Sequence, residues 1–147
     1  MPKLTPDQFL VRQTDTDSRH SISAAAGLTQ FGAFIEILQP GARSSIKHWH
    51  SAEDEMVYVL EGEVTLVEGE TETVLRPGDA AAFRAGTPVG HCLKNLSNEP
   101  TRCMVVGTRA AVDVITYPDH DRVLRRDRSL SHDAWTTIAG APAASPY

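Results

Sequence analysis

The sequence has few of the residues that mark several large classes of protein. Only 2 of its 147 residues are cysteine, so a disulfide-stabilised scaffold is excluded. No apolar run approaches the ~18–20 residues that cross a bilayer as a helix, and we expect no membrane partner. Positive charge is also scarce, because 14 Lys and Arg stand against 19 Asp and Glu for a net charge of −5. We therefore expect no nucleic-acid partner.

The rest of the composition is typical of one globular domain. Hydrophobic residues make up 41% and charged residues 22% of the chain, close to the values for soluble proteins. Residues 1–6 contain no apolar stretch of the signal-peptide type, so the expected compartment is cytoplasmic. Cys92 and Cys103 lie in apolar, strand-like sequence and are predicted to be buried free thiols.

The middle of the chain has the pattern of an all-β protein. Short segments rich in Val, Ile, Leu, Phe and Thr are separated by Gly and Pro. We predict strands at residues 28–38, 43–48, 56–60, 64–68, 71–75, 80–83, 91–96, 102–108 and 112–117. Many short strands at this spacing indicate a sandwich or a barrel. The chain is expected to divide into an N-terminal arm (1–27), a barrel (28–118) and a C-terminal arm (119–147), the last with a short helix near 131–138.

Two histidines separated by one residue carry the strongest functional signal. Residues i and i+2 of a strand point to the same face, so His48 and His50 are expected to project together. Imidazoles arranged in this way can share one metal ion. Glu55 follows at the head of an apolar strand, where a carboxylate is costly to bury unless it is paired or coordinated. The neighbouring Glu53 and Asp54 compete with Glu55 for a role in this site.

His91 is a fourth candidate ligand. It alternates with Leu93 and Asn95 on one face of a predicted strand, and it joins the same cavity if that face points inward. Three neutral imidazoles and one carboxylate would leave positions open on a metal ion that prefers five or six ligands. Open positions suit a catalytic site better than a closed structural one.

The spacing of these residues resembles the two motifs of the cupin superfamily, in particular of its small single-domain members. The matching residues are Gly41, His48, His50, Glu55 and Gly62 for the first motif, and Gly78, Gly86, His91 and Asn95 for the second. One extra residue separates Gly41 from His48, and two extra residues precede His91. Arg84 stands where the family often has proline. The spacing from His91 to Asn95 is intact, which favours His91 as the ligand.

The resemblance implies both a fold and a metal site. The fold is a double-stranded β-helix, the jelly-roll barrel of the cupins, with short arms at its two ends. The site is one divalent ion per chain (iron, manganese, nickel or zinc), held by His48, His50, Glu55 and His91. Cupins commonly pair as dimers through N-terminal strands, so we expect a homodimer to which residues 1–27 contribute.

These features leave two hypotheses on function. The first is a metal-dependent enzyme that acts on a small organic molecule, of oxygenase, decarboxylase, lyase or isomerase type, with Glu55 also accepting a proton as a catalytic residue. The second is a non-catalytic module that binds a sugar or another metabolite and uses the metal as an anchor. A purely structural barrel explains least, because it gives no cause for the spacing of His48, His50 and Glu55.

An arginine-rich stretch near the C-terminus has two readings. Its arginines alternate with aspartates: Asp119, Asp121, Arg122, Arg125, Arg126, Asp127 and Arg128. The arginines could bind an anionic substrate or the acidic surface of a partner. The interleaved aspartates favour local ion pairs instead, each worth ~0–1 kcal/mol.

Overall fold

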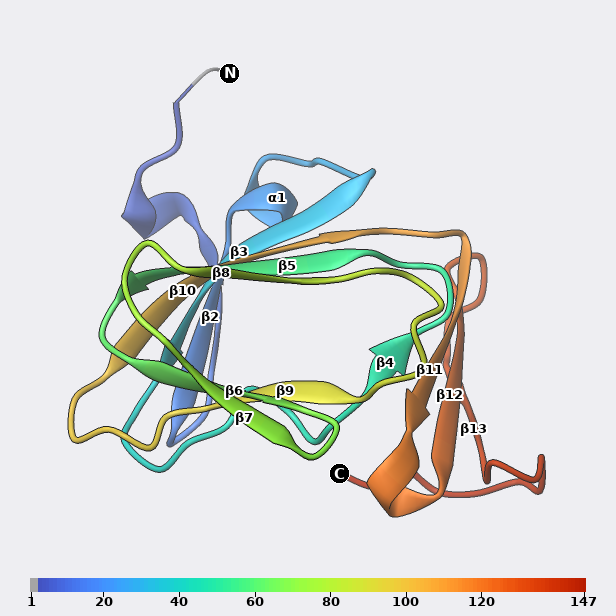
Figure 1. Ribbon diagram of the computed structural model, residues 1–147. Helices are drawn as coiled ribbons and strands as arrows, with labels where there is room; N and C mark the ends of the chain where they lie inside the picture. The colour runs from blue at the N-terminus through green and yellow to red at the C-terminus, as the bar shows by residue number, and fades with distance from the viewer. Residues whose placement is uncertain (1–2) are drawn as a thin grey trace.

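The computed structural model describes residues 3–147, and strands make up most of it (Figure 1). The strands are β1 (Leu10–Gln13), β2 (Asp17–Ser21), β3 (Phe31–Leu38), β4 (Trp49–His50), β5 (Glu55–Glu61), β6 (Val64–Glu68), β7 (Thr71–Leu75), β8 (Ala80–Phe83), β9 (His91–Lys94), β10 (Thr101–Thr108), β11 (Val112–Tyr117), β12 (Arg122–Asp127) and β13 (Ala134–Thr136). The helical segments are short: η1 (Pro6–Gln8), α1 (Ile22–Ala25) and η2 (Pro118–His120). Across residues 3–147, no helix combines the length and the hydropathy of a membrane span.

Two opposed sheets form the body of the molecule. The larger sheet has the strand order β1-β2-β3-β10-β5-β8, and the smaller has the order β7-β6-β9. Every pairing in them is antiparallel. Figure 1 shows β5 and β8 above β6 and β9, with the chain passing between the two layers several times. The predicted all-β jelly roll is confirmed, although the sheets do not close into a continuous barrel within the described residues.

The core lies between these sheets because the strands alternate buried and exposed side chains. On β5, Val57 and Val59 are buried, whereas Met56 and Tyr58 face outward. The main cluster draws on both layers and contains Leu38, Ala42, Val57, Val59, Val64, Leu75, Leu93, Cys103 and Val105. Fully burying each such valine or leucine contributes about 1.5–3 kcal/mol. Cys92 and Cys103 are free and buried as predicted, and burial raises the pKa of Cys103 to about 11.

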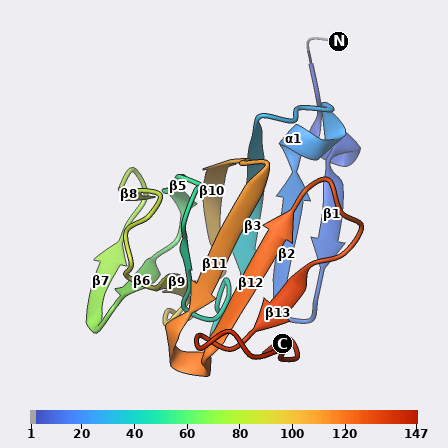
Figure 2. The same cartoon turned by 90° about the vertical axis from the view of Figure 1, so that its right-hand side faces the viewer.

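A third sheet, of order β13-β12-β11-β4, stands at one end of the molecule (Figure 2). A second apolar cluster stabilises it, with Ile46, Ile115, Tyr117 and Leu124 buried and Trp135 packed against them. The short helix predicted near 131–138 is therefore wrong. Trp135 lies in β13, which pairs with β12, because its ring gains more by packing on the cluster than a helix of a few residues could supply.

Two further expectations differ from the structure. Residues 43–48 do not form a strand; isolated bridges join Arg43 to Lys94 and His48 to His91, and the regular strand begins only at Trp49. Within the predicted N-terminal arm, the described residues 3–27 contain regular structure, since β1 and β2 extend the larger sheet next to β3. The division of the chain into a barrel and two arms stays a prediction.

Candidate metal centre

The four candidate ligands come from three separate parts of the chain. His48 precedes β4, His50 ends it, Glu55 begins β5 and His91 begins β9. Backbone hydrogen bonds fasten His48 directly to His91: His48 N donates to His91 O at 3.2 Å, and His91 N donates to His48 O at 3.0 Å. This bridge brings together residues that lie far apart in sequence.

The side chains of these residues converge. Ligand atoms of His48, His50 and Glu55 all lie within 4.8 Å of one another. His91 stands beside this set: its ring centroid is 5.1 Å from that of His48, and its Nε2 is 3.5 Å from Glu55 Oε1. Three imidazoles and one carboxylate form a donor set suited to a divalent transition metal. The assignment of these residues as metal ligands stays a prediction.

Hydrogen bonds to Nδ1 orient the His48 ring so that its other ring nitrogen, Nε2, is free for a metal. His48 Nδ1 lies 3.0 Å from Ile46 O and 3.2 Å from Ser45 Oγ. A carbonyl oxygen only accepts, so Nδ1 carries the hydrogen and Nε2 of the neutral ring keeps its lone pair. Burial, together with the neighbouring rings of His91 and His50, lowers the pKa of His48 to about 4. His48 is therefore neutral at neutral pH, as a ligand must be.

His91 carries the clearest sign of a missing partner. It is 4% exposed, and its Nε2 is a buried polar atom without a hydrogen-bond partner in the described residues. Phe83 stacks on the ring with 3.6 Å between centroids and 3° between planes, which fixes its orientation. An unpaired buried nitrogen costs about 1–3 kcal/mol. A metal ion at this position would remove that cost.

Glu55 is held as a carboxylate by the histidines around it. Burial alone raises its pKa, but the close contact with His91 and the electrostatic influence of the three imidazoles together outweigh burial and lower the pKa. The side chain is 25% exposed, so it is also open to a small molecule. An ionised, partly accessible carboxylate can ligate a cation and can accept a proton.

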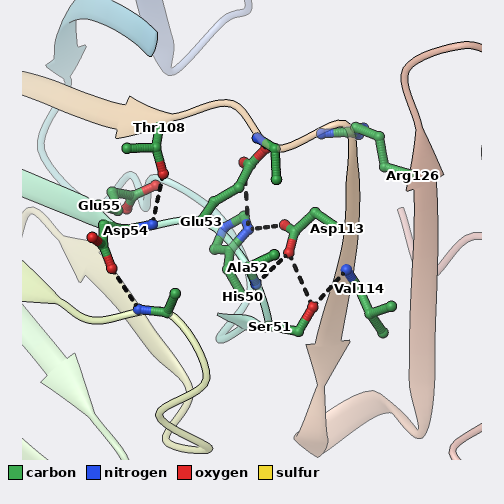
Figure 3. A network of polar contacts seen from close by, with 12 residues as sticks. His50, Ser51, Ala52, Glu53, Asp54, Glu55, Thr108, Asp113, Val114 and Arg126 are labelled. Atoms are coloured by element: carbon green, nitrogen blue, oxygen red, sulfur yellow. Dashed lines mark hydrogen bonds and ion pairs between the residues drawn. The ribbon is translucent and has the colours of Figure 1, made fainter. Parts of the chain in front are cut away.

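A buried aspartate supports His50 from behind (Figure 3). Asp113 Oδ2 lies 2.6 Å from His50 Nδ1, and Asp113 Oδ1 accepts hydrogen bonds from Ala52 N at 2.9 Å and from Ser51 Oγ at 3.2 Å. Asp113 is 1% exposed. Burial raises its pKa, but the bonds from His50, Ala52 and Ser51 outweigh this effect and hold the pKa below its ordinary value. Such a carboxylate fixes the tautomer of a metal-binding imidazole.

The sequence analysis missed Asp113, although a signal was present. Asp113, Ile115 and Tyr117 occupy alternate positions of β11, and all three are buried. A carboxylate on the apolar face of a strand requires a buried partner. The sequence contains that pattern but cannot identify His50, 63 positions away, as the partner.

The arginine-rich stretch forms ion pairs, but not with the aspartates interleaved in it. Arg126 pairs with Asp133 at 3.0 Å, and Arg128 Nη2 lies 2.7 Å from Glu53 Oε1. Glu53 also accepts a hydrogen bond from Ala110 N at 2.9 Å. The C-terminal segment thus neutralises Glu53, whose Oε2 is 3.9 Å from His50 Nδ1.

A cavity of about 240 Å³ opens beside the candidate ligands. Side chains that line it include His50, Glu53, Glu68, Phe83, Arg84 and His91. Its volume lies below the ~300–1,000 Å³ of pockets that hold drug-sized ligands, so it suits a small metabolite. A second cavity, of about 300 Å³, lies near Lys47. There Lys47 is already paired with Asp119 at 3.1 Å and with Glu70 at 3.7 Å.

Several solved structures are similar to this chain. Over 98% of both chains, the protein is 37% identical to a sugar phosphate isomerase of the cupin superfamily from Silicibacter pomeroyi, with a TM-score of 0.90. A proposed sugar phosphate isomerase from Acidithiobacillus ferrooxidans is 28% identical over 87% of this chain and 81% of its own, with a TM-score of 0.77. A proposed oxalate decarboxylase from Thermotoga maritima, at 16% identity over 74% of this chain and 99% of its own and a TM-score of 0.62, shares the fold. No curated protein matches the chain in sequence.

The family model for the cupin domain matches residues 34–107. This range contains all four candidate ligands and runs from β3 to β10. Together with the 37% identity over nearly the whole chain, the match shows that the protein belongs to the cupin superfamily.

Proposed function

We propose that the protein is a metal-dependent isomerase of a small phosphorylated sugar. The observation that carries the proposal is the convergence of His48, His50 and Glu55 within 4.8 Å, beside the unpaired His91 Nε2 and a small cavity. Support for the reaction class comes from the relative named a sugar phosphate isomerase, which is 37% identical over 98% of both chains. The more distant decarboxylase shares only the fold and adds nothing on chemistry.

An aldose–ketose interconversion moves one proton between neighbouring carbons and one between their oxygens, and it needs no oxidant. A bound divalent ion would polarise the carbonyl and make the neighbouring C–H more acidic. Glu55 is ionised and partly exposed, so it can accept that proton and return it to the adjacent carbon. His50, fixed by Asp113, and His91, fixed by Phe83, would hold the ion without reorientation during the reaction.

The homodimer stays part of the proposal. The outer face of β5 presents Met56, Tyr58 and Leu60, which are 43%, 40% and 39% exposed. Adjacent exposed apolar side chains of this kind are typical of a protein contact surface. Light scattering at micromolar concentration measures the mass, and a monomer would remove the dimer from the proposal.

Two measurements test the function. Elemental analysis of protein purified without added metal should find close to one divalent transition metal per chain. Incubation of that protein with short-chain aldose and ketose phosphates in deuterium oxide should give interconversion, with deuterium appearing next to the carbonyl in the proton NMR spectrum. The variant His50→Ala should lose metal and activity, whereas His132→Ala, an exposed histidine outside the site, should keep both.

Several results would contradict the proposal. Full metal occupancy in His50→Ala would overturn the ligand assignment. Substrate-dependent oxygen uptake by an iron form, without interconversion of any sugar phosphate, would point to an oxygenase. Tight metabolite binding without turnover would instead favour the non-catalytic binding module.

A further inference from the structure

An arginine lines the cavity where the second cupin motif often has proline. Arg84 follows β8 directly, and its side chain lines the cavity of about 240 Å³ together with His50 and His91. By contrast, several other arginines are already engaged in ion pairs with carboxylates: Arg19, Arg76, Arg102, Arg126 and Arg128. No carboxylate lies within ion-pair distance of Arg84 in the described part of the chain. Its positive charge is thus available to a ligand.

The backbone holds Arg84 firmly next to the candidate metal centre. Gly86 N donates to His50 O at 2.8 Å, and Ala85 N donates to Asp54 Oδ1 at 2.8 Å. Asp54 is itself fixed, because its N donates to Thr108 Oγ1 at 2.9 Å (Figure 3). The turn that carries Arg84 is therefore tied on one side to β4 and on the other to the start of β5. The backbone at Arg84 is therefore fixed relative to His50, and the side chain extends into the cavity from that anchored turn.

Two carboxylates share the cavity with Arg84: Glu53, which is paired, and Glu68, which forms no ion pair within the described residues. Glu53 is neutralised by Arg128 at 2.7 Å and accepts a hydrogen bond from Ala110 N at 2.9 Å. Thr87, three residues after Arg84, also lines the cavity and offers a hydroxyl donor. A guanidinium presents planar donors that match the oxygens of a phosphate, and the charged hydrogen bonds that result are among the strongest in proteins.

We propose that Arg84 and Thr87 form the phosphate subsite of this cavity, which makes Arg84 a residue that selects phosphorylated over unphosphorylated sugars. The proposal rests on the proposed function and adds the part of the substrate that is recognised. The phosphate binds at Arg84, and the carbonyl end of the sugar faces His50 and His91. The small cavity restricts the substrate to a short sugar chain.

Binding of inorganic phosphate to the protein as purified tests the subsite without requiring turnover. Titration calorimetry should show Arg84→Gln weakening phosphate binding by roughly tenfold or more, as expected for loss of a charged hydrogen bond. Arg84→Lys, which keeps the charge without the planar donors, should fall in between. The matched control is Arg76→Gln, which removes an exposed arginine paired with Glu63 and should leave binding unchanged.

Glu68 gives a test of opposite sign. It lines the same cavity and forms no ion pair in the described residues, so its carboxylate repels a phosphate. Glu68→Gln should therefore strengthen phosphate binding, and a weakening would contradict the subsite.

Kinetics separate the subsite from the proposed function. If the protein isomerises a sugar phosphate, Arg84→Gln should raise KM for it by the same roughly tenfold factor with kcat little changed, and should not alter KM for the unphosphorylated sugar. If phosphate binding depends on Arg84 but the protein has no isomerase activity, the phosphate subsite is supported and only the proposed function is contradicted. Phosphate affinity of Arg84→Gln within twofold of the parent protein would overturn the subsite, whatever the activity.

Discussion

The contact between Asp113 and His50 allows a quantitative test of the candidate metal centre. Asp113 accepts a hydrogen from His50 Nδ1 at 2.6 Å, so Nε2 carries the lone pair that a metal needs. In Asp113→Asn, the amide oxygen can keep the bonds from Ala52 N and Ser51 Oγ, and the amide NH2 then faces His50. Because the amide NH2 donates, His50 Nδ1 must accept, and the ring will favour the tautomer with the hydrogen on Nε2. A protonated Nε2 cannot bind a metal.

Loss of a carboxylate that orients a metal-binding histidine typically lowers metal affinity about 10–100-fold. This factor corresponds to about 1.4–2.7 kcal/mol of binding free energy. Competition with a chelator of known affinity measures the change, and heteronuclear NMR of the ring nitrogens reports the His50 tautomer in the metal-free protein. A merely structural role for Asp113 would lower the melting temperature without changing the tautomer.

The matched control is Asp127→Asn. It removes the same charge from Asp127, a half-buried aspartate at the end of β12 that accepts a hydrogen bond from Ser129 Oγ and lies on the C-terminal sheet, away from the candidate metal centre. Its metal affinity and the His50 tautomer should equal those of the parent protein. A folded Asp113→Asn variant whose metal affinity lies within twofold of the parent, with His50 Nε2 still unprotonated, would refute the reasoning.

Three further predictions concern stability, each measured by urea or thermal unfolding. Gly62→Ala should destabilise the fold by about 2–4 kcal/mol, because Gly62 has a φ of 76° and an added Cβ would lie 2.7 Å from Pro100 O. Gly78→Ala, where φ is 96° but no atom lies within contact distance of the added Cβ, should lower the free energy of unfolding by less. Equal losses of unfolding free energy in the two variants would contradict the clash at Gly62. Val57→Ala should cost about 2–3 kcal/mol as a cavity in the main core, and a loss under about 1 kcal/mol would mean that the core collapses around it. Burial outweighs the contact with Arg19 and raises the pKa of Glu36, so protonation of Glu36 favours the folded state. This stabilisation is complete at a pH below the ordinary glutamate pKa and is lost as the pH rises through the raised folded pKa; Glu36→Gln should remove that slope, and an unchanged slope would assign it to another group.

The candidate site could be predicted from the sequence because its first ligands are local in sequence. An extended backbone over residues 48–50 is enough to place both imidazoles on one face, although the regular strand begins only at Trp49. Glu55 follows after a short turn. The alternation of Val57 and Val59 with Met56 and Tyr58 likewise fixes which face of β5 is buried. Period-two patterns and turn residues therefore determined the fold class and the first three candidate ligands.

The tertiary structure decided what depends on contacts between distant segments. The bridge between His48 and His91 places the fourth imidazole, and the pairing of β11 with β4 brings Asp113 behind His50. Trp135 lies in a strand because the second apolar cluster takes its ring, which no local propensity reveals. Arg84 enters the cavity only because its turn is bonded to β4 and to Asp54. Sequence patterns encode which face of an element is buried, but the partners that bury it are set only when the whole chain packs.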